Sequence, residues 1–183
     1  MRAQLRIELR EVKPPVWRRV LVPETVTLTK LHAILQSTMG WTNSHLHEFE
    51  IAHRRYGLPD PEWDMGGEPL TDERRVRLQP LLESGVRRLT YLYDFGDHWE
   101  HVVKVEDLLP PNPDSTPIVC LGGENACPPE DVGGVPGYAE FLAALADPTH
   151  EEHEDMRRWI GYPFDPISFD LNAVNRILAY LKP

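Results

Sequence analysis

Hydrophobic and polar residues alternate at the start of the chain. Residues 5–9 read Leu-Arg-Ile-Glu-Leu, and this period of two predicts a strand with one face on a core. Pro14 and Pro15 interrupt the pattern, and residues 16–22 (VWRRVLV) predict a second strand that returns antiparallel to the first and ends at Pro23. The chain is therefore expected to begin with a wide β-hairpin.

A helical period follows the hairpin. Leucines at positions 28, 31 and 35 share one helical face, Thr27 or Thr29 is placed to cap the start, and Gly40 is placed to end it. Phe49 and Ile51 alternate with glutamates and predict a third strand. Residues 57–70 are rich in glycine, proline and aspartate and are expected to form an ordered loop. The helix is expected to pack across the hairpin.

Two strands and three helices are predicted in the second half. Residues 89–95 and 99–106 have strand patterns, and the stretch from Phe95 to His98 between them is typical of a tight turn. After a turn-rich stretch, a first helix is expected from Tyr138 to the stop at residues 147–148. A second is expected after Thr149 and Glu152, which have capping-box spacing, and a third after Asp170 as N-cap.

This order of elements predicts an α+β fold. Two strands, a helix and three strands, followed by helices, favour a mixed, mainly antiparallel sheet with a ubiquitin-like (β-grasp-like) ββαβββ core and C-terminal helices on one side. One domain over residues 1–183 is expected, with a sheet core at about 1–108 and a loop and helical part at about 109–183.

Composition narrows the class of protein. Hydrophobic residues make up 41% of the chain and charged residues 26%, which is ordinary for a globular protein. No apolar run is long enough to span a bilayer, and the first residues lack the pattern of a secretion signal. A cytoplasmic protein without membrane insertion is therefore expected.

The charge is unevenly distributed. Residues 1–90 hold 14 basic and 12 acidic groups, whereas residues 91–183 hold 5 basic and 17 acidic ones. A protein that binds duplex DNA usually presents a clustered basic face, so an acidic face suited to a basic protein partner is favoured. Four arginine pairs, which begin at Arg18, Arg54, Arg74 and Arg87, leave a nucleic-acid patch as the minor alternative.

The densest polar cluster lies at the predicted turn after residue 93. It contains Asp94, Asp97, His98 and His101, with Trp99 among them. Mixed oxygen and nitrogen donors suit a divalent cation, and a bound cation can activate water. The competing interpretation is that the aspartates accept hydrogen bonds from turn amides and that His101 is a half-buried strand residue.

A second source of imidazole ligands is the sequence His45-Leu46-His47. In a strand, His45 and His47 face the same side, which is how many two-histidine metal sites begin, whereas at a helix or loop end their side chains diverge and a surface role is favoured. Glu130 and Asp131 are candidates for an acidic site or for capping the helix that follows.

The cysteines and glycines give weaker evidence for a functional site than the histidines and carboxylates do. Cys120 and Cys127 are too few for a disulfide framework and too widely spaced for a typical zinc pair, so a structural or metal role requires borrowed histidines. The sequence contains no phosphate-binding GxxxxGK[ST] or GxGxxG motif and no G-x-S-x-G nucleophile elbow. A divalent metal ion is the one cofactor that the pattern suggests.

Several longer strings resemble a known family. They are VWRRVLVP, TLTKLHAILQSTMGW and HLHEF in the first half, and YDFGDHWEH, CPPEDVGGVPGY and FDPISFDLNAVNRIL in the second. In these strings taken together, the chain resembles the plasmid pRiA4b open-reading-frame-three-like proteins, which include the insertion-element passenger protein labelled TnpR. The resemblance implies an α+β domain found on plasmids and beside transposases, without an established activity.

Three functions follow as hypotheses. The first is a non-catalytic accessory or interaction domain, because no complete catalytic constellation stands out. The second is a metal-dependent hydrolase or nuclease that uses Asp94, Asp97, His98 and His101, with His45, His47 and Glu130. The third is a nucleic-acid-binding adaptor. Site-specific recombination is not expected, because no serine precedes Ser37 and the late tyrosines lie in the acidic half.

Overall fold

The structure of the protein is a computed structural model that describes residues 1–59, 70–112 and 118–181. Ten residues of the loop expected at 57–70, residues 60–69, lie outside the described part. The sheet is built from β1 (Arg2–Leu9), β2 (Trp17–Pro23), β3 (His47–Ile51), β4 (Arg54–Gly57), β5 (Thr71–Asp72), β6 (Arg88–Tyr93), β7 (Trp99–Leu109) and β8 (Val119–Glu124). The helices are α1 (Leu28–Met39), α2 (Leu78–Glu83), α3 (Gly134–Ala146), α4 (His153–Ile160) and α5 (Leu171–Leu178), with a 3-10 turn η1 (Glu73–Arg75).

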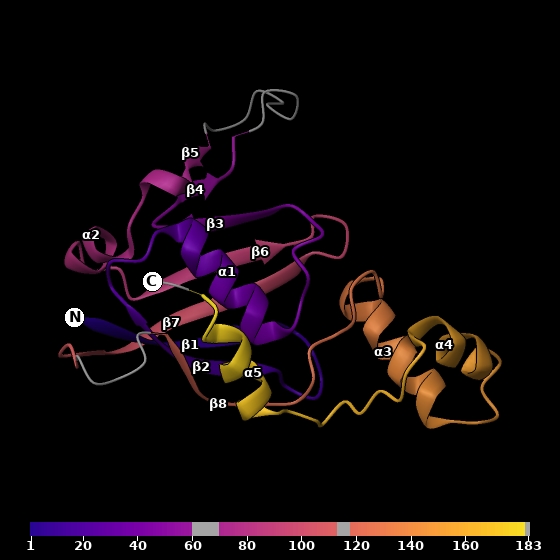
Figure 1. The fold of residues 1–183 in the computed structure, drawn as a ribbon. Coiled ribbons are helices and arrows are strands. Elements are labelled where there is room, and N and C mark those ends of the chain that lie inside the picture. The colour runs from indigo at the N-terminus through magenta and orange to yellow at the C-terminus, as the bar shows by residue number, and fades with distance from the viewer. Residues whose placement is uncertain (60–69, 113–117, 182–183) are drawn as a thin grey trace.

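The strands form one mostly antiparallel sheet in the order β5-β4-β3-β6-β7-β1-β2-β8 (Figure 1). The hairpin of β1 and β2 pairs Leu5 with Val20, and β1 also pairs antiparallel with β7. The predicted ββαβββ order is present as β1, β2, α1, β3, β6 and β7. The α+β class with a mainly antiparallel sheet and C-terminal helices is confirmed, and β4, β5 and β8 are added at the edges of the sheet.

Helix α1 lies across one face of the sheet and α5 lies beside it (Figure 1). The limits of α1 follow from local chemistry, because the Thr27 side chain accepts the amide of Lys30 and Gly40 takes a left-handed conformation at the end. The core between α1 and the sheet is aromatic and aliphatic. Its largest fully buried members are Trp99, Tyr91, Tyr93, Phe49, Leu5, Ile7, Leu28, Leu31, Ile34 and Leu35.

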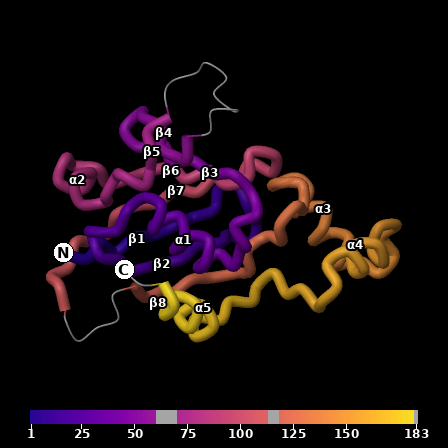
Figure 2. Tube along the Cα trace, turned by 45° about the horizontal axis from the view of Figure 1, so that its top comes forward, coloured from indigo at the N-terminus to yellow at the C-terminus, as the bar shows by residue number. Residues whose placement is uncertain are grey.

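Helices α3 and α4 lie to the side of the sheet and do not cover either face (Figures 1 and 2). Helix α3 ends at Asp147 as expected, and Asp170 caps α5 through the amide of Ala173. The capping box expected before α4 is wrong, because Glu152 is the N-cap without a side-chain bond and the Thr149 hydroxyl donates to Asp147 instead. No helix within the described ranges is long and apolar enough to cross a membrane.

The arginine pairs make contacts within the protein. Arg18 is buried, and its guanidinium donates to four backbone carbonyls. Its neighbour Arg19 pairs with Glu106, Arg55 pairs with Glu48, and Arg74 pairs with Asp72. Nucleic-acid binding through these arginines stays a hypothesis.

Candidate metal centre

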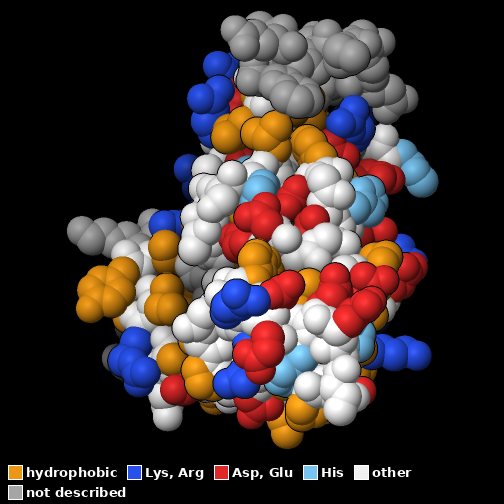
Figure 3. Space-filling model, turned by 90° about the vertical axis from the view of Figure 1, so that its right-hand side faces the viewer, with side chains coloured by type: hydrophobic (Ala, Val, Ile, Leu, Met, Phe, Trp, Pro, Cys, Tyr) orange, Lys and Arg blue, Asp and Glu red, His pale blue; other side chains and the backbone are white. Residues whose placement is uncertain are grey.

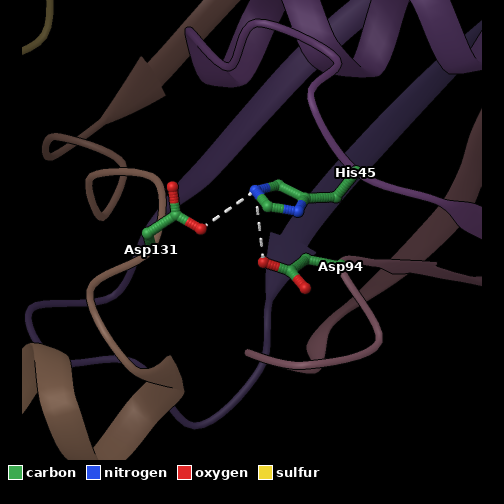
Figure 4. A group of neighbouring side chains, drawn as sticks. All are labelled: His45, Asp94 and Asp131. Atoms are coloured by element: carbon green, nitrogen blue, oxygen red, sulfur yellow. Dashed lines mark ion pairs between the residues drawn. The ribbon is translucent and has the colours of Figure 1, made fainter.

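Three segments that are distant in sequence meet at one end of the sheet, where His45, Asp94 and Asp131 point toward one another (Figure 4). His45 lies just before β3, Asp94 follows β6, and Asp131 lies in the loop between β8 and α3. The Nε2 atom of His45 is 3.2 Å from Asp131 Oδ1 and 3.6 Å from Asp94 Oδ2. One ligand atom from each residue lies within 4.8 Å of the other two.

The imidazole nitrogen of His45 faces a group of carboxylates without a hydrogen bond to any of them. Nε2 is buried and has no hydrogen-bond partner among the residues that the structure describes, although Glu130 Oε2 lies at 3.6 Å in addition to the two aspartates. A tetrahedral ion with bonds of about 2.1 Å separates its ligand atoms by about 3.4 Å. The observed separations from Nε2 match that spacing, so the arrangement suits coordination of a cation.

The Asp94 carboxylate is oriented by its own turn. Oδ1 accepts the amides of Gly96 at 2.9 Å and Asp97 at 3.3 Å, which leaves Oδ2 for His45. The Asp94 amide donates to the Leu46 carbonyl at 2.9 Å, and this bond places the carboxylate beside His45. Asp94 and Asp131 both have positive φ angles, of 57° and 58°, a strained conformation that clusters at functional sites.

Glu130 is held beside the site by neutral donors. Its Oε1 accepts the Thr42 amide at 2.8 Å and the Thr42 hydroxyl at 3.1 Å, and the Tyr93 hydroxyl lies 3.1 Å from both carboxylate oxygens. Burial, and then the negative charge of Glu130, raise the pKa of Tyr93. Tyr93 therefore keeps its proton and acts as a donor to the carboxylate.

The site carries uncompensated negative charge. The ion pairs of Asp94, Glu130 and Asp131 within the described part of the chain all go to the one imidazole of His45. Three carboxylates this close repel one another, and a divalent cation is the species that best relieves the repulsion.

A close backbone contact brings the loop before α3 against the hairpin that carries Asp94. The Gly133 amide donates to Asp97 Oδ2 at 3.1 Å. Gly134 has a φ of +67°, and a Cβ there would lie 2.5 Å from the Asp97 carbonyl oxygen. Only glycine allows this approach, and the approach sets how near Asp131 comes to Asp94.

We expect Gly134→Ala to weaken metal binding about 10- to 100-fold, the range typical of changes that move ligands without removing them, because the new methyl group pushes the loop from the hairpin. Isothermal titration with Zn²⁺ or Mn²⁺ measures the change. Gly133→Ala is the matched control, since Gly133 also has a positive φ but a Cβ there meets its nearest atom, Gly137 Cα, at 3.5 Å. Equal affinities for the two variants would contradict the role of the close contact.

The other predicted ligands lie elsewhere. His98 is exposed, and the Asp97 carboxylate accepts a hydrogen bond from the Gly133 amide. His101 is fully buried in β7, where Nδ1 donates to the carbonyls of Tyr91 and Trp99, and Trp99 belongs to the core. His47 is buried and its Nε2 lies 2.9 Å from Glu73 Oε2.

The cysteines are free and do not lie in this site. Burial raises the pKa of the Cys120 and Cys127 thiols, which disfavours the thiolate form that binds metals.

Sequence reasoning missed the residues that orient Glu130. Thr42 and Ser44 precede His45, and the Ser44 amide donates to the Tyr93 hydroxyl at 3.0 Å. Tyr93 is adjacent to Asp94 in the YDFGD string, so its position next to a candidate ligand was the available signal. No pattern in the sequence indicated Glu73, the buried partner of His47.

The fold and the site define an α+β protein with a candidate divalent-metal centre at one end of an eight-stranded sheet. The chain belongs to the plasmid pRiA4b ORF-3-like protein family, whose sequence model matches residues 1–173.

Two relatives support this assignment. The chain is 45% identical over 175 residues to the uncharacterized protein y4hQ of Sinorhizobium fredii (strain NBRC 101917 / NGR234), and the match covers 94% of this chain and 88% of y4hQ. It is also similar to the crystal structure of MM3350, a protein of unknown function from Methanosarcina mazei Go1. That similarity has a TM-score of 0.85 and 37% identity, and it covers 94% of this chain and 95% of MM3350. These comparisons establish the family and fold, and they show no established activity.

Proposed function

We propose that the protein binds one divalent transition-metal ion through His45, Asp94 and Asp131, with Glu130 beside the ion. The observation that carries the proposal is the buried His45 Nε2, which faces three carboxylates at 3.2–3.6 Å without a hydrogen bond to any of them. Nitrogen and oxygen donors in this combination suit Zn²⁺, Mn²⁺ or Fe²⁺ better than Ca²⁺.

Hydrolysis is the chemistry that such a centre supports best. Three protein ligands leave a coordination position open, as in catalytic and unlike structural zinc sites. The Asp131 side chain is 71% exposed, so water and a substrate can approach from that side. A bound ion would lower the pKa of its water, and Glu130, whose Oε1 accepts the Thr42 amide, would be the neighbouring carboxylate that takes up the proton. This proposal favours the metal-dependent hydrolase over the purely accessory domain.

The test is metal binding by the wild-type protein and two ligand variants. Untagged protein, stripped with a chelator and dialysed, is expected to take up about one equivalent of Zn²⁺ or Mn²⁺ and to melt at a higher temperature when loaded. His45→Ala and Asp94→Asn are expected to lose more affinity than the 10- to 100-fold typical of outer-shell changes. Asp94→Asn suits this purpose because asparagine tolerates the positive φ and keeps an acceptor for the turn amides.

His98→Asn is the matched control. His98 belongs to the same hairpin and has a φ of 58°, but its side chain is exposed and is not among the residues that converge on His45. This variant is expected to bind metal like the wild type. The proposal would be overturned if neither chelator nor added cations changed the melting temperature of the wild-type protein. It would also be overturned if both ligand variants kept the metal affinity of the wild type.

A further inference from the structure

A cleft of about 500 Å³ opens between α3, α4 and the segment that follows α4. Its apolar lining comes from Leu145, Ile160, Tyr162, Pro163 and Phe164, and its polar lining includes His153 and Arg157. A volume of this size accommodates a small ligand or a large side chain. None of these residues belongs to the candidate metal centre.

Two polar side chains of the cleft have partners within the protein. His153 donates from Nδ1 to the Ala144 carbonyl at 2.8 Å. Arg157 pairs with Glu154 at 3.4 Å, one turn earlier on the same helix. An occupant therefore meets the apolar side chains beside the paired Arg157, and Tyr162 is 57% exposed.

The surroundings of the cleft are acidic. Residues 147–165 carry six acidic and two basic groups, and both arginines are paired on α4, Arg157 with Glu154 and Arg158 with Asp155. Glu151 and Glu152 are exposed and directly precede the cleft residue His153. Figure 3 shows acidic side chains gathered on the side of the molecule that carries α3 and α4. An anionic occupant is disfavoured here and a basic one is favoured.

We propose that this cleft is a docking site for a basic amphipathic segment of another protein. The segment inserts one large apolar side chain between Ile160, Tyr162 and Phe164 and sets lysines or arginines against Glu151 and Glu152. A buried anchor in a pocket supplies most of the affinity of such contacts, and the opposite charges around it supply the association rate and the specificity.

The probe is a short, fluorescently labelled peptide of lysine and leucine with helical spacing, titrated with the metal-free full chain. Two further peptides act as comparisons, one of lysine and serine with the same charge and one of glutamate and leucine with the opposite charge. Only the lysine and leucine peptide is expected to bind, and its affinity is expected to fall as salt is added. Equal binding of the lysine and serine peptide would overturn the proposal, because no anchor is then needed.

Variants localise the contact. Tyr162→Ser, and separately the double change Glu151→Lys with Glu152→Lys, are each expected to weaken binding about tenfold or more. All three side chains are exposed, so the fold is expected to survive. Tyr180→Ser and Glu83→Lys are the matched controls, since Tyr180 is 87% exposed beyond α5 and Glu83 is exposed on α2. No binding of the probe by the wild type, or equal losses in the control variants, would also overturn the proposal.

Discussion

Lowering the pH from 7 to 5 is expected to remove roughly 4 kcal/mol from the free energy of unfolding of the metal-free protein, about 2 kcal/mol for each of two buried histidines. Burial lowers the pKa of both His32 and His101 to about 4 in the folded state. In the unfolded chain each has a pKa near 6.5. Between these values the unfolded state binds more protons, so stability falls as the pH falls from about 6.5 toward 4.

Hydrogen bonds fix the tautomer of the buried, neutral His32. Gln36 donates to the Tyr91 hydroxyl at 3.0 Å, so the hydroxyl proton goes to Nδ1 of His32 at 2.8 Å. Nε2 then donates to Asn43 Oδ1 at 2.7 Å. The ring also stacks on His47, with centroids 3.5 Å apart. Protonation of His32 costs stability first because the ring is buried and then because it lies beside His47, and a second proton on Nδ1 would also face the Tyr91 hydrogen.

Urea unfolding at pH 7, 6 and 5 in the presence of a chelator measures this loss. Carboxylates with lowered pKa values, such as Glu106 at about 2, lose their stabilising effect below about pH 4.5, so the window above pH 5 belongs to histidines. His32→Gln is expected to halve the pH dependence whatever its stability at pH 7, whereas the exposed His98→Asn is expected to keep it. If His32→Gln lost as much stability between pH 7 and pH 5 as the wild type does, the assignment of half of this loss to His32 would be contradicted.

The elements that could be predicted are those whose limits depend on neighbouring residues. Thr27 and Gly40 fix the ends of α1 through contacts within one turn, and the sequence contained both. The capping box at Thr149 has equally good spacing, but the Asp147 carboxylate lies closer along the chain and takes the Thr149 amide and hydroxyl. A local motif predicts structure only where no nearer partner competes for its donors.

The candidate site was predicted as separate parts. His45, Asp94, Glu130 and Asp131 were named from three separate stretches of sequence, and the hydrolase hypothesis combined the first three with residues that lie elsewhere. Their meeting depends on the pairing of β3 with β6 and on the contact of Gly134 with the Asp97 backbone, neither of which a sequence pattern specifies. Conversely, Asp94 and His101 lie only seven residues apart, yet strand alternation places the His101 side chain in the core beside Trp99.

The same alternation separates two arginines that the sequence presents as a pair. Arg18 is 3% exposed and donates to the carbonyls of Trp17, Thr38, Glu124 and Asn125 at 2.8–2.9 Å. It thereby joins β2 to the end of α1 and to the end of β8 with the residue that follows it, and its guanidinium stacks over Phe169 at 4.3 Å. Arg19 points to the other face and pairs with Glu106 in a partly exposed position.

Arg18→Met is therefore expected to cost about 3–5 kcal/mol of stability, because it leaves buried carbonyl acceptors without donors. Arg19→Met removes the same chemical group from the next residue and is expected to cost about 1 kcal/mol or less, as is usual for exposed ion pairs. Urea unfolding of both variants at neutral pH measures the difference. Equal losses would mean that charge alone matters at this strand, whereas a large difference would locate the stabilisation in the four carbonyl bonds that only the buried arginine makes.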